Sequence, residues 1–404
     1  MDMARCGGHY YSDKAPGTAA LALGPFILGS LAVKASGESV ESPAGWLTTS
    51  WVTCAAVNAV PLAIGFTLLA AWLRRLVSAR AALLTVLGIS LGGMPLIYAT
   101  ALWSHSLVCG LICVAIWCLA PFTGDNPRPG RLGAAGVALG LALASEFTAG
   151  LVIAALCWHT WRNHRHRAVY LALGAIAPLL LIPAYNLAVT GSPFILPYSH
   201  QASFPEMGKG IYAIRWPDPE TLGALLCSPE RGLLTWCPFL LLAGVGYWQM
   251  LHDSPQPLWL TYAVPLLTLI VISGRVWDWQ AGWCLGPRYL TPILPLLALP
   301  CALAARRLPG ISAALAALSM LLVTQAVLTS VIIPDWYHAP LLQFHWPLWR
   351  EGKLSPNLGR LAGLSPWASV APFYLILTGG IWRLWRQAKA LDTATAAPDH
   401  AALP

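Results

Sequence analysis

Apolar residues fill most of the chain in long segments, and polar residues are concentrated between these segments. A helix that crosses a bilayer needs roughly 20 apolar residues, and by this criterion we predict about eleven such helices. They lie near residues 46–72, 81–101, 103–120, 132–145, 146–161, 168–189, 232–252, 258–273, 289–305, 311–331 and 367–385. The pattern therefore predicts an all-α fold, a polytopic membrane helical bundle.

The first apolar segment, residues 17–35, is barely long enough to cross a bilayer, and Lys34, Glu38 and Glu41 follow it closely. If this segment did cross, every later helix would invert and the arginines near residue 75 would move to the outer side. We therefore predict that residues 17–35 form a juxtamembrane helix that lies along the outer surface of the membrane.

The distribution of basic residues predicts the orientation of the bundle. If residue 1 is outside, the inner loops are short and rich in basic residues, as the positive-inside rule expects. These residues are Arg74, Arg75, Arg80, Arg128, Arg131, Arg162, Arg165, Arg167, Arg306, Arg307, Arg383, Arg386 and Lys389. We expect a multi-pass protein of the inner (plasma) membrane, with its N-terminus outside and its C-terminus cytoplasmic.

This orientation places the three long loops, 190–231, 274–288 and 332–366, on the outer side, together with most polar and aromatic residues. Any chemistry is expected there, on a face that would be periplasmic in a bacterium. Residues 1–389 are predicted to form a single transmembrane domain. The polar, alanine-rich residues 390–404 are predicted to be a disordered cytoplasmic tail.

Composition agrees with a membrane protein and argues against other classes. Of 404 residues, 57% are hydrophobic and 10% are charged, whereas a soluble domain has about 25% charged residues. The net charge of +8 comes from residues at helix ends rather than from one exposed basic face, so we predict no nucleic-acid partner. Most of the ten cysteines fall in apolar segments, and a Cys227–Cys284 disulfide between outer loops is an open alternative.

The turn "SDKAPG" just before residues 17–35 places Lys14 near the depth of lipid headgroups. An ammonium group there suits a phosphate, because lysine is a compact donor for phosphate oxygens. The alternative is a lysine that extends to the interface and pairs with Asp13.

Two arginines are each predicted to begin a helix at its outer end: Arg231 in "SPERGLL" and Arg288 in "LGPRYL". Helix N-termini attract anions through their free amides and their dipole. Together with Lys14, these arginines predict a shared anion site, although each alone could be an interfacial anchor.

Six stretches resemble GT-C type membrane glycosyltransferases, the class that includes protein mannosyltransferases and the aminoarabinose lipid A transferases. The stretches are "YYSDKAPGTAALAL", "ATALWSHSLVCGL", "LASEFTAGLV", "YNLAVTGSPFILPYSH", "SPERGLLTWCPFLLL" and "GWCLGPRYLTPILPLLALP", which together span roughly residues 8–330. The first is similar to the first-loop motif of that class, in which the lysine contacts a lipid phosphate. The resemblance assigns this role to Lys14.

The resemblance implies a donor of the form polyprenyl-phosphate-sugar, an unidentified lipid, glycan or protein acceptor, and contact with membrane lipids. Members of the class carry a first membrane helix and a loop acid well before the lysine turn, whereas thirteen residues precede Lys14 here. We therefore expect a chain that begins inside a loop and whose catalysis is altered or lost unless a preceding segment exists.

Glycosyl transfer needs a carboxylate that takes the acceptor proton or orients the acceptor. Asp13 and Glu146 are the candidates, because an acid such as Glu146 within an apolar segment is functional by default. The alternative role of Asp13 is an ion pair with Lys14. The alternative role of Glu146 is to cap the turn between two short helices. His105, Tyr198, Trp277, Asp278 and Tyr289 are candidates for binding the sugar or the acceptor, although the aromatic rings could form an interfacial belt.

We predict no cofactor, and a divalent cation at His105 is an open alternative, with His9 and His200 able to approach it. Two rival functions also remain: a transporter or flippase for a lipid-linked substrate, and a catalytically inactive lipid-binding relative. A transporter would predict related halves with broken helices near the membrane midplane, and no convincing internal repeat is visible.

Overall fold

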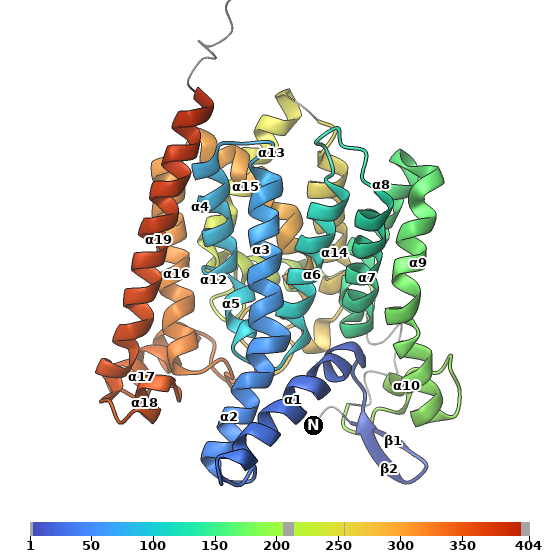
Figure 1. Cartoon of the computed structure of the whole chain (residues 1–404), viewed down its shortest axis with the longest axis vertical. Helices are drawn as coiled ribbons and strands as arrows, with labels where there is room; N and C mark the ends of the chain where they lie inside the picture. The colour runs from blue at the N-terminus through green and yellow to red at the C-terminus, as the bar shows by residue number, and fades with distance from the viewer. Residues whose placement is uncertain (1–2, 205–213, 254, 397–404) are drawn as a thin grey trace, which may run out of the picture.

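A computed structural model describes residues 3–204, 214–253 and 255–396 of the chain. Its long helices lie roughly side by side in one bundle (Figure 1), which confirms the all-α helical bundle. Every segment predicted to cross the membrane is helical over most of its length. Part of one predicted outer loop, residues 205–213, lies outside the described residues.

The bounds of the elements follow the predicted segments closely. The first half of the chain forms β1 (Met3–Cys6), β2 (His9–Ser12), α1 (Gly17–Ala35), α2 (Pro43–Cys54), α3 (Val60–Leu73), α4 (Ala79–Ser90), α5 (Met94–Ala99), α6 (Ser104–Leu119), α7 (Pro129–Ser145), α8 (Gly150–Asn163), α9 (Ala168–Leu179) and α10 (Leu181–Thr190). The second half forms α11 (Pro219–Cys227), α12 (Leu233–Trp236), α13 (Leu242–Asp253), α14 (Val264–Ser273), α15 (Leu294–Arg307), α16 (Pro309–Thr329), α17 (Trp346–Arg350), α18 (Leu358–Leu361) and α19 (Pro366–Ala396).

Among the described residues, five helical segments are long and apolar enough to cross a membrane: Gly17–Ala35, Pro43–Leu73, Arg165–Thr190, Arg288–Arg307 and Pro309–Thr329. Most of the others are shorter or are broken by turns, as between α4 and α5, whereas α19 is long but is not among these five. The total of about eleven crossings therefore stays a prediction.

The two ends of the bundle differ in the loops that they carry. The short arginine-rich connections α3–α4, α6–α7, α8–α9 and α15–α16 lie at one end, together with the C-terminal end of α19 (Figure 1). The β1–β2 hairpin, α1, α10, α17 and α18 lie at the opposite end. This is the separation that the charge pattern predicts, and the side of the membrane that each end faces stays a prediction.

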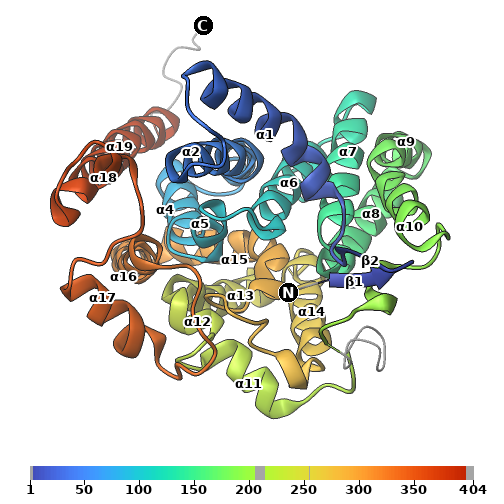
Figure 2. The same ribbon diagram turned by 90° about the horizontal axis from the view of Figure 1, so that it is seen from below.

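Helix α1 lies across the end of the bundle and packs against α2 and α7, at an angle to the long helices (Figures 1 and 2). Its far side is apolar and exposed, with Leu23 at 61% and Leu28 at 67% of full exposure. A helix in this position agrees with the predicted juxtamembrane role of residues 17–35.

Gly17, the first residue of α1, touches the C-terminal end of α7 so closely that a larger residue cannot fit. A Cβ atom there would lie 2.6 Å from Ser145 Oγ and 2.7 Å from the carbonyl oxygen of Ala144. We therefore expect Gly17→Ala to destabilise the protein by about 1–3 kcal/mol, the usual effect of overpacking. Thermal unfolding in detergent measures this effect. Gly24→Ala in the same helix, where a Cβ meets nothing within 4 Å, is the control and should be neutral or stabilising. Equal unfolding temperatures for both variants would contradict the close contact.

The N-terminal residues form an antiparallel β-hairpin that the all-α prediction did not include. Met3 pairs with Ser12 and Cys6 with His9, and the turn consists of Gly7 and Gly8, with φ of 56° and 83°. Two consecutive positive φ angles suit a two-residue hairpin turn, because its twist matches that of the strands. The hairpin leads directly into Asp13 and Lys14, and Ala4 forms a bridge to Gln201.

The predicted disordered tail is corrected in part, and the open alternative of a Cys227–Cys284 disulfide is not present. Helix α19 continues to Ala396, so residues 390–396 are helical rather than disordered; residues 397–404 lie outside the described part of the chain. Asp392 explains the extension, because it accepts hydrogen bonds from the amide of Ala79 (2.6 Å) and from Arg80 Nε (2.8 Å) at the start of α4. All ten cysteines are free thiols; Cys227 is exposed whereas Cys284 is buried.

The contact between Asp392 and α4 predicts a pH-dependent stability. Burial tends to raise the pKa of Asp392, but the hydrogen bonds from Arg80 and from the amides of Ala79 and Arg80 hold it below its usual value. Because the folded-state pKa is lowered, this stabilisation is complete above the unfolded pKa of about 3.9 and is lost as the pH falls through the folded-state pKa. We expect Asp392→Asn to lower stability by about 0.3–1 kcal/mol at neutral pH, the usual value of a negative charge at a helix N-terminus. Thermal unfolding of both proteins from pH 7 to pH 3 should show the difference closing, and a difference independent of pH would contradict the assignment.

Candidate functional site

A cavity of about 680 Å³ lies at the end of the bundle that carries α1 and the hairpin. Five separate parts of the chain form its wall: the turn before α1, the start of α6, the end of α7, helix α10 with the following loop, and the segment before α15. Its polar and aromatic lining residues are Ser12, Lys14, Thr18, Trp103, Ser104, His105, Ser145, Glu146, Phe147, Tyr185, Tyr198, Arg288 and Tyr289. Six of the residues predicted from the sequence therefore meet in one cavity: Lys14, His105, Glu146, Tyr198, Arg288 and Tyr289.

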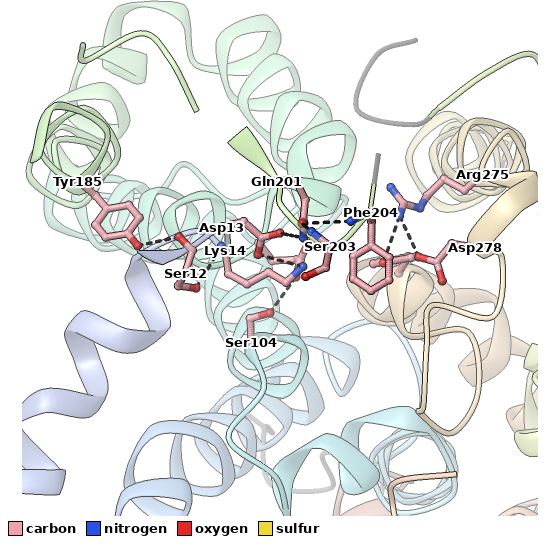
Figure 3. Close-up of polar contacts among 12 residues, drawn as sticks. Ser12, Asp13, Lys14, Ser104, Tyr185, Gln201, Ser203, Phe204, Arg275 and Asp278 are labelled. Carbon is pink, nitrogen blue, oxygen red and sulfur yellow. Dashed lines mark hydrogen bonds and ion pairs between the residues drawn. The ribbon is translucent and has the colours of Figure 1, made fainter. Parts of the chain in front are cut away.

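Lys14 is held in the cavity wall by the residues on either side of it and by the loop after α10 (Figure 3). Its amide donates to Ser12 Oγ (3.2 Å), and Tyr185 Oη donates to the carbonyl oxygen of Ser12 (2.7 Å). The Lys14 ammonium lies 3.5 Å from Asp13 Oδ1 and over the ring of Tyr198, 5.2 Å from its centre. The side chain is thus oriented, and 42% of it is exposed.

Asp13 does not line the cavity. Its carboxylate is buried, accepts a hydrogen bond from Gln201 Nε2 (2.8 Å) and pairs with Lys14. Asp13 therefore has the ion-pair role that the sequence left open as an alternative. It orients Lys14 and is poorly placed to act as a base.

Glu146 is the carboxylate that faces the cavity, and the chain folds locally to present it. Helix α7 ends at Ser145, and Glu146 has an extended backbone (φ −158°, ψ 114°) before the short 3₁₀ turn Phe147–Ala149. Its Oε1 accepts from Thr148 Oγ1 (3.1 Å), and its Oε2 accepts from Ser104 Oγ (2.8 Å). His105 Nδ1 lies 3.7 Å from Oε2. Glu146 therefore caps the turn between α7 and α8, which is the alternative role that the sequence left open. It also presents its carboxylate to the cavity.

Arg288 supplies the second cation. It begins the 3₁₀ segment Arg288–Ile293 that continues into α15. Its guanidinium lies between two rings, 5.4 Å from the centre of Trp103 and 5.3 Å from that of Tyr289. Within the described part of the chain, its buried Nε has no hydrogen-bond partner. A partly buried cation of this kind, facing a cavity, favours an anionic ligand.

The aromatic residues of the wall are fixed by contacts with one another. His105 packs edge-on against Tyr98 and Tyr289, with ring centres 5.1 Å and 6.4 Å apart. Burial raises the pKa of Tyr198, so its phenol stays protonated at neutral pH and can donate a hydrogen bond. Tyr98 in turn donates to the carbonyl oxygen of Leu285 (2.6 Å), and Asn58 donates to the carbonyl oxygen of Tyr98 (3.2 Å).

Arg231 does not join the other two cations, which corrects the prediction of a three-cation site. It is fully buried, and its guanidinium donates to the carbonyl oxygens of Glu230 (3.2 Å) and Ile333 (3.3 Å). Helix α12, which follows it, has four residues, so it lacks the long N-terminus that the prediction assumed. Arg231 fastens the loop before α12 to the loop after α16.

Trp277 and Asp278 also lie outside the cavity lining. Both contact Arg275, whose Nη2 lies 3.1 Å from Asp278 Oδ2 and whose guanidinium lies 5.8 Å from the centre of the Trp277 ring. Arg275 also lies over the ring of Tyr289, 4.8 Å from its centre. Trp277 and Asp278 therefore hold Arg275 in place, and Arg275 in turn packs over the ring of Tyr289. Figure 3 shows Arg275 beside Asp278.

Sequence reasoning missed Ser104, Trp103 and Arg275. Ser104 directly precedes His105 in "LWSHSL", and its hydrogen bond to Glu146 required the end of α7 to lie against the start of α6. Arg275 is the basic residue in "SGRVWDW", close to the predicted Trp277 and Asp278. Within the described residues, no group of three or more His, Cys, Asp or Glu side chains could hold a metal ion; His105 has a single carboxylate beside it.

No protein-family model and no curated protein sequence matches the chain. Its structure is similar to two crystal structures of ArnT from Cupriavidus metallidurans, one bound to undecaprenyl phosphate and one in the apo state. The first has a TM-score of 0.47 and 15% sequence identity, and the second has a TM-score of 0.42 and 17% identity. Each comparison covers 96% of this chain and 66% of the ArnT chain, so the present chain spans just under two-thirds of the length of that protein.

Proposed function

We propose that the protein is a membrane glycosyltransferase that moves a sugar from a polyprenyl-phosphate-linked donor to an acceptor at the end of the bundle that carries α1. The observation on which this rests is a single cavity that brings together two cations, Lys14 and Arg288, with the carboxylate of Glu146. This combination suits a reaction in which one group loses a proton while negative charge accumulates on another.

Lys14 and Arg288 are the proposed partners of the donor phosphate. The first turn of α1 supports them, because Thr18, Ala19 and Ala20 line the same cavity and no side chain caps this helix. Free amides at a helix N-terminus and its dipole favour an anion. The exposed apolar side of α1, beside the cavity, offers a surface for the prenyl chain.

Glu146 is the proposed base. It takes the proton of the acceptor hydroxyl while the acceptor oxygen bonds to the anomeric carbon of the sugar. The bond between that carbon and the phosphate oxygen breaks, and the electron pair leaves with polyprenyl phosphate, whose charge Lys14 and Arg288 stabilise. Ser104 and Thr148 orient the carboxylate, and His105, Tyr198 and Tyr289 lie where they can contact the sugar.

The test is turnover with a labelled polyprenyl-phosphate sugar. Purified protein in detergent is incubated with the donor, and release of polyprenyl phosphate is followed by chromatography with and without a membrane-lipid extract as the source of acceptor. We expect release that depends on the extract and on an intact Glu146. Donor binding without release in any extract would favour the inactive lipid-binding relative. Movement of intact donor across the bilayer of a proteoliposome would favour the transporter.

A further inference from the structure

A second cavity, of about 710 Å³, lies at the arginine-rich end of the bundle, opposite the first. It is enclosed by the α6–α7 loop, the end of α8 and the residues before and within the π-helical turn Trp259–Ala263. Its lining includes Phe122, Asp125, His159, Arg162, His164 and Trp259. None of these residues belongs to the glycosyl-transfer site proposed above.

The charge of this cavity is positive, because its one carboxylate is already neutralised. Asp125 accepts two hydrogen bonds from Arg75, one of them at 2.8 Å, and lies 3.9 Å from Arg131. The remaining charged side chain of the lining is Arg162, which is exposed. Burial and the neighbouring Arg167 lower the pKa of His164, so this imidazole is a neutral donor at pH 7.

An aromatic wall faces these polar groups. The ring of His159 stacks on Trp259, with centres 5.8 Å apart and planes 19° apart, and the ring of Phe122 meets it edge-on at 5.5 Å. Arg167 donates to Asn126 Oδ1 (2.8 Å) and so fastens the α8–α9 turn to the α6–α7 loop. The cavity therefore has a fixed apolar side and a basic, solvent-facing side.

The loop that forms this wall has a backbone that ordinary residues rarely adopt. Ala120 has φ 44° and Phe122 has φ 65°, two of the three positive-φ non-glycine residues in the described part of the chain. A left-handed residue just after a helix is usually glycine, which has no Cβ to clash. Side chains kept in such a conformation are concentrated at binding sites, where the surrounding structure holds the strain. Here that conformation presents the Phe122 ring to His159.

We propose that this second cavity binds a phosphate-bearing ligand, with Arg162 and His164 on the phosphate and the Phe122–His159–Trp259 wall against the adjoining apolar part. The guanidinium fork matches phosphate oxygens, and basic pockets between membrane helices bind anionic headgroups. The phosphate can belong to an anionic phospholipid or to a soluble phosphate ester. This inference does not depend on the proposed transferase activity.

The experiment uses the full-length protein in detergent and has two arms. Native mass spectrometry measures retention of phosphatidylglycerol against phosphatidylcholine, and thermal unfolding measures stabilisation by inorganic phosphate. We expect Arg162→Gln to weaken binding about tenfold, the effect of one charge-assisted hydrogen bond. Arg165→Gln is the matched control: it removes the same charge from the next turn, where Arg165 lies over Trp161 and does not line the cavity.

Selective retention of phosphatidylglycerol that Arg162→Gln alone reduces identifies a lipid headgroup, and stabilisation by phosphate that Arg162→Gln alone reduces identifies a soluble ligand. Equal loss in both arginine variants would mean nonspecific attraction and would overturn the proposal, as would an absence of binding in both arms.

Two further substitutions distinguish an effect of the aromatic wall on ligand binding from an effect on folding. Phe122→Gly removes the ring but keeps the left-handed backbone, so binding should fall, and the relief of backbone strain should partly offset the lost packing of the ring against the core. Ala120→Gly relieves the same kind of backbone strain without removing a lining ring, so binding should not change. Unchanged binding by Phe122→Gly would overturn the role of the wall.

Discussion

Replacing Glu146 by glutamine is expected to abolish most of the glycosyl transfer while leaving the protein folded and able to bind its donor. Glutamine keeps an oxygen that can accept from Ser104 and Thr148, so the turn after α7 should survive. The amide cannot take a proton from an acceptor. Because general-base catalysis contributes typically 10²–10⁴-fold, we expect the turnover number to fall by about this factor.

The control for this variant is Glu230→Gln. Glu230 is a buried glutamate that lies outside the cavity, with its carboxylate 3.8 Å from His338. Its replacement should leave turnover unchanged, whatever it does to stability. Release of polyprenyl phosphate from labelled donor measures turnover, and retention of the donor on the immobilised protein measures binding. If Glu146→Gln retained turnover, or lost donor binding to the same extent as turnover, Glu146 would not be the base.

The bundle could be predicted from the sequence because membrane helices are specified locally. Each needs a long apolar segment, and nothing beyond the segment itself is required to recognise it. The charge pattern likewise predicted which loops share an end of the bundle. Short loops rich in arginine and lysine can be recognised individually along the chain, and the positive-inside rule places them on one side. The broken helix at α4 and α5 was predicted as one segment, although Gly92, Gly93 and Pro95 favour a break in the chain locally. The sequence does not show that Gly92 packs against Ser319, far away along the chain.

The site was predicted only in part. Residues whose positions follow from local sequence could be predicted, and residues whose positions depend on contacts between distant elements could not. Lys14, Glu146 and Arg288 each follow or precede a helix end in a polar turn, so their exposure to a common end of the bundle could be inferred. Whether they share one cavity depends on packing between distant elements, such as the contact of Gly17 with Ala144 and Ser145. Arg231 satisfied the same local pattern as Arg288, but the backbone carbonyl of Ile333, 102 residues away, occupies its guanidinium.

Lys14 and Arg288 are expected to act on the same phosphate, which a double-mutant cycle can test. Removing one charge-assisted hydrogen bond to the phosphate should weaken donor binding by about 1.5–3 kcal/mol, or roughly tenfold to a hundredfold. Lys14→Ala and Arg288→Ala should each show this loss. Lys34→Ala, which removes a lysine from the opposite end of α1, should show none.

The double variant carries the decisive information. Two cations that contact one phosphate are coupled, so the combined loss should differ from the sum of the single losses by about 0.5–3 kcal/mol, whereas independent sites would add. Arg288→Lys should not restore binding, because a lysine ammonium cannot reproduce the planar guanidinium held between Trp103 and Tyr289. Additive losses, or donor affinity unaffected by Lys14→Ala, would separate the two cations and remove the basis for placing the donor phosphate between them.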